Sequence, residues 1–165
     1  MIFVDAGNCV GWSLHYLVVD PPQEIHCALG MGPMGFGVGA VVGAKLGQPS
    51  TTCVALVGDG AFMMHSGEVS TARRNGIGAI WIVLNDDDLG MVTQGMEHFF
   101  PDKLNPDAWT ELYRLGSPDL AKVAEGLGAT AYTVNSPAEL ERILPKVIEQ
   151  ANNARTPQVV VAHVQ

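Results

Sequence analysis

Two acidic stretches follow apolar runs of this sequence and could together hold a metal ion. Gly58-Asp59-Gly60 comes after the run Cys53–Val57, and Asn85-Asp86-Asp87-Asp88 comes after the run Ala79–Leu84. A strand, a helix and a second strand would bring both stretches to one edge of a parallel sheet. Carboxylates that converge repel each other and raise each other's pKa unless a cation lies between them. We therefore predict a cation site at this edge.

Magnesium is the cation that this pattern favours. It prefers oxygen ligands in octahedral geometry and typically takes one or two protein carboxylates, while phosphate oxygens complete its shell. The amides of Gly60 and Ala61 would lie at a helix start or in the turn before it, where an anion is favoured. The predicted ligand is a magnesium diphosphate. A solvated acidic loop would explain the triple Asp alone, but it explains the two stretches together less well.

A second glycine motif allows a different interpretation. The segment "GMGPMG", Gly30 to Gly35, fits G-x-G-x-x-G, follows an apolar run and opens a predicted helix. It could mark a non-catalytic nucleotide- or cofactor-binding module. However, Pro33 removes one backbone donor from the loop. The acidic residue expected about 20 residues further on has only Asp59 as a candidate, and Asp59 lies between two glycines.

Alternating apolar runs and helical spacings predict the elements that position these motifs. The predicted strands are Ile2–Val4, Ile25–Leu29, Cys53–Val57, Ala79–Leu84, Thr130–Val134 and Val159–Val164. The predicted helices are Phe36–Leu46, Ser66–Asn75, Asp119–Leu127 and Pro137–Asn152. This alternation predicts an α/β fold with a doubly wound, mostly parallel sheet of about six strands and helices on both faces. The stretch 85–117 is less regular, and we expect a functional loop there.

The composition of the chain argues against two classes of binding partner. The formal net charge of −8 argues against nucleic acid or an anionic membrane surface, because both would repel the chain. No apolar stretch is long enough to span a bilayer. Cys9, Cys27 and Cys53 form no CxxC pair and no metal-ligand spacing, which is typical of buried thiols in a reducing compartment. We therefore expect one cytoplasmic domain that binds neither nucleic acid nor membrane.

The segment "GDGAFMMHSGEVSTARRNGIGAIWIVLNDDDLGMV", residues 58–92, resembles the thiamine diphosphate motif, which begins with GDG and closes with a pair of Asn residues. It is most similar to the acetolactate synthase branch, whose closing run reads LNN followed by LGMV. "DAGN" at 5–8, "GPMGFGVGAVVGAKLG" at 32–47 and the tail 119–165 also resemble that branch. The resemblance implies that residues 1–165 form one thiamine diphosphate (PP) domain. It also implies that the pyrimidine-binding and central domains of the full enzyme are absent.

The resemblance also implies the roles of individual residues. Asp59, Asp86 and the backbone carbonyl of Asp88 would bind Mg²⁺, and Asp86 stands where the family usually has its second Asn. The remaining cofactor contacts would be Gly7, Asn8 and Cys9 in the first diphosphate loop, Gly58, Gly60 and Ala61 in the second, Gly32 at the aminopyrimidine, Met34 beneath the bent cofactor, and Leu89, Gly90 and Met91 closing over it.

For function, the resemblance implies part of a thiamine diphosphate-dependent 2-oxo acid decarboxylase or carboligase, a lyase or transferase. The family's catalytic glutamate lies on the pyrimidine-binding domain of a neighbouring subunit, and Glu68 matches a different position. We therefore expect no catalytic residue in this chain, no turnover by the chain alone, and a homo- or hetero-oligomer. An excised domain and a natural small subunit both remain open. Gly95 stands where acetolactate synthases usually have a tryptophan, which puts acetolactate as the product in question.

Overall fold

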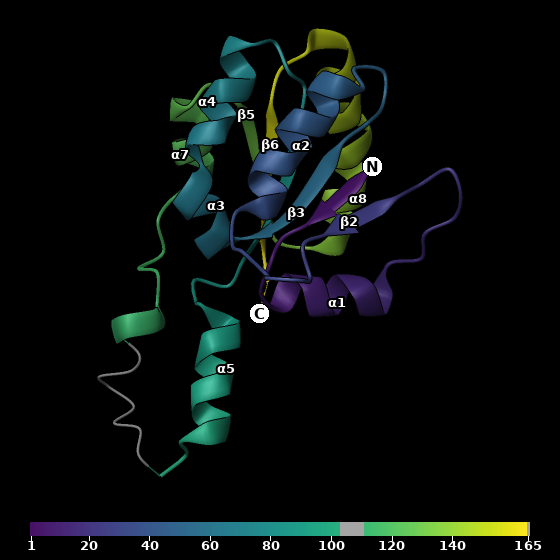
Figure 1. Cartoon of the computed structure of the whole chain (residues 1–165). Coiled ribbons are helices and arrows are strands. Elements are labelled where there is room, and N and C mark those ends of the chain that lie inside the picture. Colours follow the sequence, from purple (N-terminus) through teal and green to yellow (C-terminus); the bar gives the residue numbers. More distant parts are fainter. Residues whose placement is uncertain (103–110, 165) are drawn as a thin grey trace.

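Figure 1 shows the computed structural model of the chain, which describes residues 1–102 and 111–164. The strands are β1 (Ile2–Val4), β2 (Ile25–Cys27), β3 (Val54–Gly58), β4 (Ile80–Asn85), β5 (Thr130–Val134) and β6 (Gln158–His163). The helices are α1 (Asn8–Tyr16), α2 (Phe36–Gly47), α3 (Asp59–His65), α4 (Gly67–Arg74), α5 (Gly90–Phe99), α7 (Leu120–Gly126) and α8 (Pro137–Glu149). The last of these runs into a π-helical turn, Gln150–Ala154.

The six strands form one sheet in the order β2-β1-β3-β4-β6-β5, and every pair is parallel. The chain first moves outward from β1 to β2 and then returns to place β3 on the other side of β1. The strand order therefore reverses between β1 and β3, and doubly wound sheets bind their ligands outside such a switch point. The predicted α/β class is confirmed, with a sheet that is parallel throughout.

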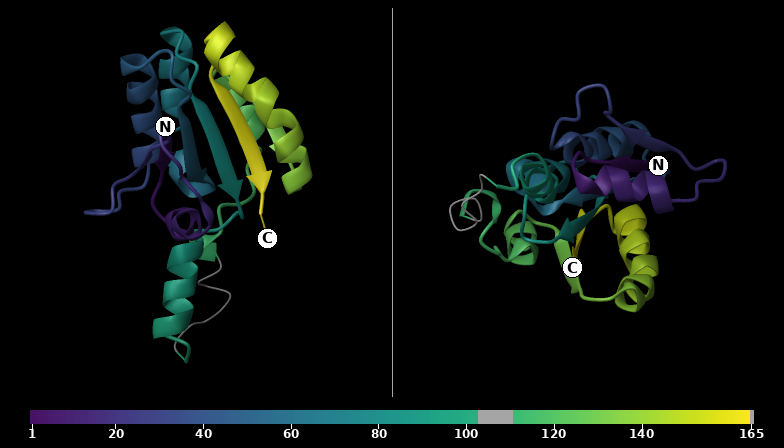
Figure 2. Two further views of the ribbon diagram at one scale, coloured as in Figure 1. Left: turned by 90° about the vertical axis from the view of Figure 1, so that its right-hand side faces the viewer. Right: turned by 90° about the horizontal axis from the view of Figure 1, so that it is seen from below.

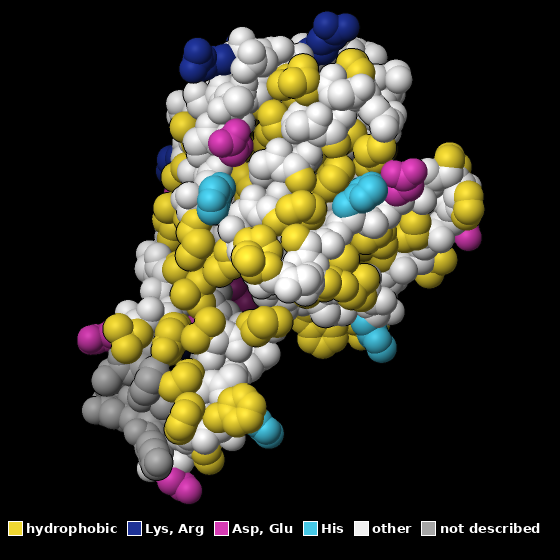
Figure 3. Space-filling view, viewed as in Figure 1, with side chains coloured by type: hydrophobic (Ala, Val, Ile, Leu, Met, Phe, Trp, Pro, Cys, Tyr) yellow, Lys and Arg dark blue, Asp and Glu magenta, His cyan; other side chains and the backbone are white. Residues whose placement is uncertain are grey.

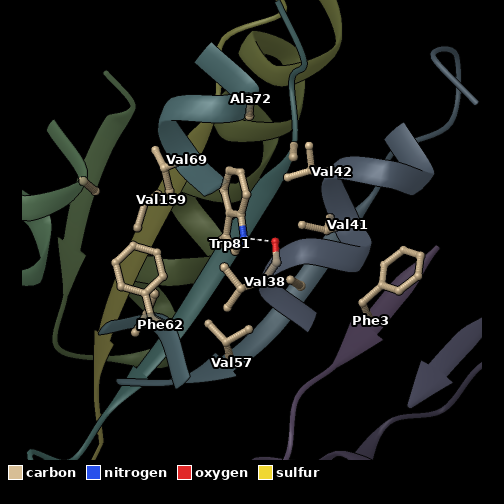
Figure 4. Close-up of a cluster of buried hydrophobic side chains, with 14 of the residues drawn as sticks. Phe3, Val38, Val41, Val42, Val57, Phe62, Val69, Ala72, Trp81 and Val159 are labelled. Carbon is tan, nitrogen blue, oxygen red and sulfur yellow. Dashed lines mark hydrogen bonds between the residues drawn. The ribbon is translucent and has the colours of Figure 1, made fainter. Parts of the chain in front are cut away.

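The larger core lies between the sheet and the helices α2, α3, α4 and α7. Trp81 of β4 is fully buried, and its indole N–H donates to the carbonyl of Val38 in α2, at 3.1 Å (Figure 4). Phe62 of α3 and Val69 of α4 pack into the same cluster. A buried indole needs a partner for its N–H, so this bond fixes how α2 lies on the sheet.

The second face of the sheet is covered by α8 (Figure 2). Val147 of this helix packs with Ile80 of β4 and Val160 of β6. The backbone of Gly78 lies directly against the Ala151 carbonyl, so no side chain fits at Gly78. Helices therefore lie on both faces, as predicted, with most of them on the face of α2.

The structure adds three helices that the sequence analysis does not predict: α1, α3 and α5. The last of these occupies part of the stretch 85–117, where we expected an irregular loop. It extends away from the body of the molecule, and none of its residues is buried (Figures 1 and 2). Residues 103–110 of that stretch lie outside the described residues. In the described ranges, every helix is too short or too polar to cross a bilayer.

Candidate cofactor site

Thirteen of the fourteen residues that the sequence analysis assigns to the cofactor line one cavity of ≈ 480 Å³, a size usual for small-molecule sites. They are Gly7, Asn8, Cys9, Met34, Gly58, Asp59, Gly60, Ala61, Asp86, Asp88, Leu89, Gly90 and Met91. The fourteenth, Gly32, lines a second cavity of ≈ 300 Å³, which shares Ala6, Gly7 and Met91 with the first. The fold thus brings together residues from four separate parts of the chain.

The cavity lies where the sheet topology favours a ligand. Its lining includes the residues that follow β1 and β3, the two strands between which the order reverses, and also the start of α5, which follows β4. All of these strands are parallel, so the segments after them meet at the same edge. The cavity is therefore the crevice at the topological switch point.

Asp59 is the buried acid of this cavity, with 3% of its surface exposed. Its Oδ1 accepts from the N–H of Gly60 at 2.7 Å, and its Oδ2 accepts from the N–H of Asp87 at 2.8 Å. Burial raises the pKa of Asp59 to about 6. The charge of Asp86 also raises this pKa, whereas the backbone amides of Gly60, Asp87 and Asp86 lower it. A divalent cation would remove this conflict between burial and charge.

Asp86 and Asp88 complete the acidic side of the cavity. The Oδ1 of Asp86 accepts weakly from the N–H of Asp88, at 3.4 Å, and the side chain of Asp88 accepts from the Thr93 hydroxyl at 2.9 Å. Among the described residues, no three Asp, Glu, His or Cys side chains converge as a metal-binding group. A cation here would therefore have two carboxylates at most and take its other oxygens from carbonyls, water or a ligand, as Mg²⁺ does.

Three helices begin at the cavity: α1, α3 and α5. Their N-cap residues are Gly7, Gly58 and Leu89, and within the described chain none of the three helices receives a side-chain cap. The amides of a first helical turn have no intrahelical acceptor, and they favour an anion in front of them. These helix starts, which we call the rim of the cavity, therefore suit phosphate oxygens. Asp59, Asp86 and Asp88, which we call its acidic floor, suit a cation bound to the phosphates.

Cys9 lines the cavity through the first turn of α1. Its thiol donates to the carbonyls of Asp5, at 2.9 Å, and Ala6, at 3.1 Å. Burial, followed by the nearby charge of Asp5, raises the pKa of the Cys9 thiol to about 11. The group is therefore a neutral hydrogen-bond donor near pH 7 and is not a nucleophile.

Two glycines keep the cavity open. A Cβ on Gly60 would lie 2.6 Å from the Leu89 side chain and 3.2 Å from Met34 Cε. A Cβ on Gly90 would lie 3.0 Å from Asn8 Nδ2 and 3.2 Å from Asp86 Oδ2. The polar groups of the first and third loops thus approach each other across Gly90, in a space that a side chain would narrow.

The glycine loop Gly30–Gly35 has its helix start occupied by a carboxylate. Asp5 is fully buried, and it accepts the N–H groups of Gly35 and Gly37, both at 2.8 Å, and of Val38 at 3.4 Å. A pyrophosphate at the start of α2 would compete with this charge for the same donors. The geometry therefore disfavours the nucleotide interpretation of this loop.

Sequence reasoning missed several residues at the site. Asp5 is one of them: besides the neighbouring N–H of Ala6, its carboxylate accepts from amides at the start of α2 that lie 30 or more residues away, so no local pattern reveals this role. The cavity is also lined by residues that were not predicted: Ala6, Trp12, Leu84, Val92, Gln94 and Val164. Of these, Trp12 could have been found from helical spacing, because it lies one turn after Asn8 in α1.

The fold and the site together define a class of protein. It is a doubly wound α/β domain whose cavity lies at the topological switch point, where three helices begin and three acidic residues, Asp59, Asp86 and Asp88, line the wall. The chain matches the family described as "Thiamine pyrophosphate enzyme, C-terminal TPP binding domain" over residues 5–162. The chain therefore belongs to this family. The buried carboxylate, its acidic neighbour and the three helix starts fit the cation and the diphosphate of such a cofactor.

Acetolactate synthases are among the similar proteins. The chain is 36% identical over 140 residues to the acetolactate synthase large subunit of Haemophilus influenzae, which covers 85% of this chain and 23% of that protein. It is 32% identical over 151 residues to acetolactate synthase isozyme 3 large subunit of Escherichia coli, covering 92% and 25%. It is 31% identical over 155 residues to acetolactate synthase 1, chloroplastic, of Oryza sativa, covering 90% and 23%. The chain spans about a quarter of the length of these relatives.

Proposed function

We propose that this chain binds the diphosphate half of thiamine diphosphate through a magnesium ion. The observation that carries the proposal is that three helix starts converge on one cavity whose acidic residues are Asp59, Asp86 and Asp88. In this proposal Asp59 and Asp86 bind the ion through carboxylate oxygens, and Asp88 binds it through its backbone carbonyl. Amides at the rim and carboxylates at the floor are the donor set that a magnesium diphosphate needs.

The glycine-rich rim receives the rest of the cofactor. The first turn of α1, with Gly7, Asn8 and Cys9, and the amide of Ala61 donate to the diphosphate. The N–H of Gly60 already donates to Asp59. Gly60 therefore contributes mainly by lacking a side chain, which leaves space for the cofactor. The other proposed contacts are Gly58 beside the ion, Leu89, Gly90 and Met91 over the diphosphate, Met34 beneath the bent cofactor and Gly32 at its aminopyrimidine.

When bound, thiamine diphosphate supplies the carbon nucleophile and the electron sink for decarboxylation of a 2-oxo acid. The residues of this chain hold the ion, orient the diphosphate and keep a neutral thiol beside it. We assign no catalytic residue to the chain. A glutamate on a pyrimidine-binding domain or subunit completes the site in this proposal, so the chain alone is inactive.

An exposed apolar surface beside the cavity supports such a partner. Apolar side chains gather on the lower half of the molecule, around the junction with α5 (Figure 3). Trp12, Met91 and Val92, which line the cavity, expose 59%, 50% and 42% of their surfaces. Extended apolar surface of this kind marks an interface between proteins or domains. The proposal therefore includes a homo- or hetero-oligomer, and a cytoplasmic location consistent with three free cysteines.

The whole reaction is a decarboxylation or carboligation of a small 2-oxo acid, of the acetolactate synthase type. The names of the relatives support this class, since each of the three is an acetolactate synthase or its large subunit. Gly95 in α5 leaves open space at a position close to the cavity residues Val92 and Gln94. We therefore propose a 2-oxo acid substrate class and no particular acceptor.

Calorimetric titration of the purified chain with thiamine diphosphate tests this function. One titration contains magnesium and the other contains EDTA. Binding that requires magnesium is the expected result, because the carboxylates repel a diphosphate that lacks its cation. Failure to bind in both titrations would contradict the proposal. Binding of NADH, in a parallel titration, would favour the Gly30–Gly35 loop as the functional motif.

A further inference from the structure

Asp87 lies between two residues of the proposed cation site, yet its side chain faces a different cavity. Asp86 and Asp88 line the cofactor cavity, whereas Asp87 lines a smaller cavity of ≈ 260 Å³ together with Ser117. Only the backbone of Asp87 reaches the site, since its N–H donates to Asp59 Oδ2 at 2.8 Å. Asp87 therefore contacts the cation site through this amide.

The backbone of Asp87 has a left-handed conformation, with φ at 59°. Residues with a Cβ rarely adopt it, although Asp and Asn tolerate it better than most. The N–H that donates to Asp59 lies on one side of this φ bond, and the side chain and carbonyl of Asp87 lie on the other, so a return to an extended or right-handed φ would require the chain on one side of the amide to rearrange. The hydrogen bond to Asp59 thus depends on whatever holds Asp87 in this conformation.

Two side-chain hydrogen bonds hold it. Asp87 Oδ1 accepts from Asn85 Nδ2 at 3.2 Å, and Asp87 Oδ2 accepts from the Ser117 hydroxyl at 2.8 Å. Asn85 is buried at the end of β4, so the first bond attaches Asp87 to the sheet. Ser117 belongs to the segment that leads from α5 to α7, and the N–H of Leu115 in the same segment donates to the Asp87 carbonyl at 2.9 Å.

We propose that Asp87 is a positioning residue of the cation site. Its carboxylate fixes the left-handed backbone, and the backbone amide orients the Asp59 carboxylate for the ion. An ionised carboxylate has about four acceptor positions, so the two amide bonds that Asp59 accepts, from Gly60 and Asp87, leave room for a cation. Partners in this outer shell orient metal ligands and influence affinity strongly. The inference rests on the proposed function, because it requires that Asp59 binds a cation.

Direct coordination by Asp87 is the competing interpretation, and the geometry disfavours it. The Asp87 side chain lies outside the lining of the cofactor cavity and lines a separate cavity with Ser117. The two interpretations predict different results for a substitution that keeps the hydrogen bonds but removes the charge.

Four variants of the full chain separate these possibilities. Asp87→Asn keeps both hydrogen bonds, because a hydroxyl at Ser117 can accept as well as donate, and Asn tolerates a positive φ. Asp87→Gly tolerates the conformation but loses both bonds. Asp87→Ala loses both hydrogen bonds and also tolerates a positive φ poorly. Ser117→Ala removes one bond at an exposed position, so the core remains intact.

The measurement is the Kd of magnesium thiamine diphosphate by calorimetry, at low salt and at high salt, with circular dichroism as the test of folding. We expect Asp87→Ala to weaken binding by about 10- to 100-fold, the range found for outer-shell partners of metal ligands. Asp87→Gly and Ser117→Ala fall between Asp87→Ala and the unchanged chain. Asp87→Asn stays within about threefold of the unchanged chain, because its hydrogen bonds persist.

Two results would overturn the inference. If Asp87→Asn weakens binding as much as Asp87→Ala, the charge of Asp87 acts directly and its hydrogen bonds do not matter. If folded Asp87→Ala and Ser117→Ala bind as tightly as the unchanged chain, Asp87 has no role in the site. Loss of binding by Asp59→Ala is the separate test of the site itself. An unchanged chain that fails to bind contradicts the proposed function and this inference with it.

Discussion

The three helices that begin at the cavity differ from two that begin elsewhere, α7 and α8. Of the other helices, α2 has the Asp5 carboxylate at its first amides, and α4 follows directly on α3 at Ser66 with no side-chain cap. In the helix α7, the Asp119 side chain accepts from the N–H of Lys122, and in α8 the Ser136 hydroxyl accepts from the N–H of Glu139. In the described chain, α1, α3 and α5 have no such cap. A side-chain cap normally stabilises a helix start, so three starts without one, all at the same cavity, indicate donors that are kept for a ligand.

The strongest test of this difference is removal of the buried acid. Asp59→Ala should weaken magnesium thiamine diphosphate by at least about 100-fold, since loss of a direct ligand should exceed the effect of losing an outer-shell partner. Calorimetry measures the loss. The matched control is Asp119→Ala, which removes an exposed acid of the same size from the cap of α7. Equal affinities of the two variants would show that the acidic floor of the cavity does not bind the cation.

Next in size is the effect of pH on binding, which follows from the raised pKa of Asp59, about 6. Below pH 6 the carboxyl is protonated, and the cation must displace that proton, so the apparent Kd should rise by up to about tenfold per pH unit. Above pH 7 it should level off. Titrations in buffers of different ionisation enthalpy would detect the proton release near pH 6. A Kd that is constant from pH 5 to 8 would contradict a role for Asp59.

The same pKa predicts the opposite trend for stability without ligand. The folded-state pKa of Asp59, about 6, lies above the unfolded value of 3.8. Between these two values the folded chain binds more protons than the unfolded chain, so the contribution of Asp59 to stability falls as pH rises from about 4 to 6. Thermal unfolding with and without magnesium thiamine diphosphate would show the two slopes. The ligand-free Tm of the unchanged chain should fall more from pH 4 to 6 than the Tm of Asp59→Ala. Equal falls in the two Tm values would argue against the raised pKa of Asp59.

A smaller effect is expected from Gly90 at the start of α5. Gly90→Ala would place a Cβ between Asn8 and Asp86, and we expect about tenfold weaker binding, the lower end of outer-shell effects. The matched control is Gly95→Ala in the same helix, where a Cβ meets open space. That change should leave Kd unaltered and stabilise α5 by roughly 1 kcal/mol. If both variants bind equally well, the space at Gly90 has no function.

The same difference explains what could be read from the sequence. The strand Thr130–Val134 was predicted correctly. The start of α8 at Pro137 was also predicted correctly, because Ser136 and Pro137 are typical helix-start residues. The starts at Gly7 and Leu89 have no typical cap, so α1 and α5 were missed. A helix start without a capping side chain lacks the residues by which helix starts are recognised in a sequence. Local rules therefore fail at these starts, as they often do at functional sites.

The site itself was predictable where its residues form motifs and not where they act over long distances. Gly58-Asp59-Gly60 and the acidic run after β4 pointed to the cavity from their order alone. Asp5 and Asp87 did not, because Asp5 accepts from a loop 30 residues away and Asp87 contacts Asp59 through its backbone N–H. Sequence spacing gives no indication of a left-handed residue or of a buried carboxylate that caps a distant helix.

The smallest effect is expected from the capped side of the molecule. Ser136→Ala removes the side-chain acceptor at the start of α8 and should lower the free energy of unfolding by about 1 kcal/mol. The Kd for magnesium thiamine diphosphate should not change, because Ser136 lies outside the lining of the cofactor cavity. Chemical denaturation and calorimetry measure the two quantities, and Ser136→Thr, which keeps the hydroxyl, is the control. A change in Kd with Ser136→Ala would mean that stability and binding are coupled throughout the fold, and that the contrast between capped and uncapped helices does not separate the two roles.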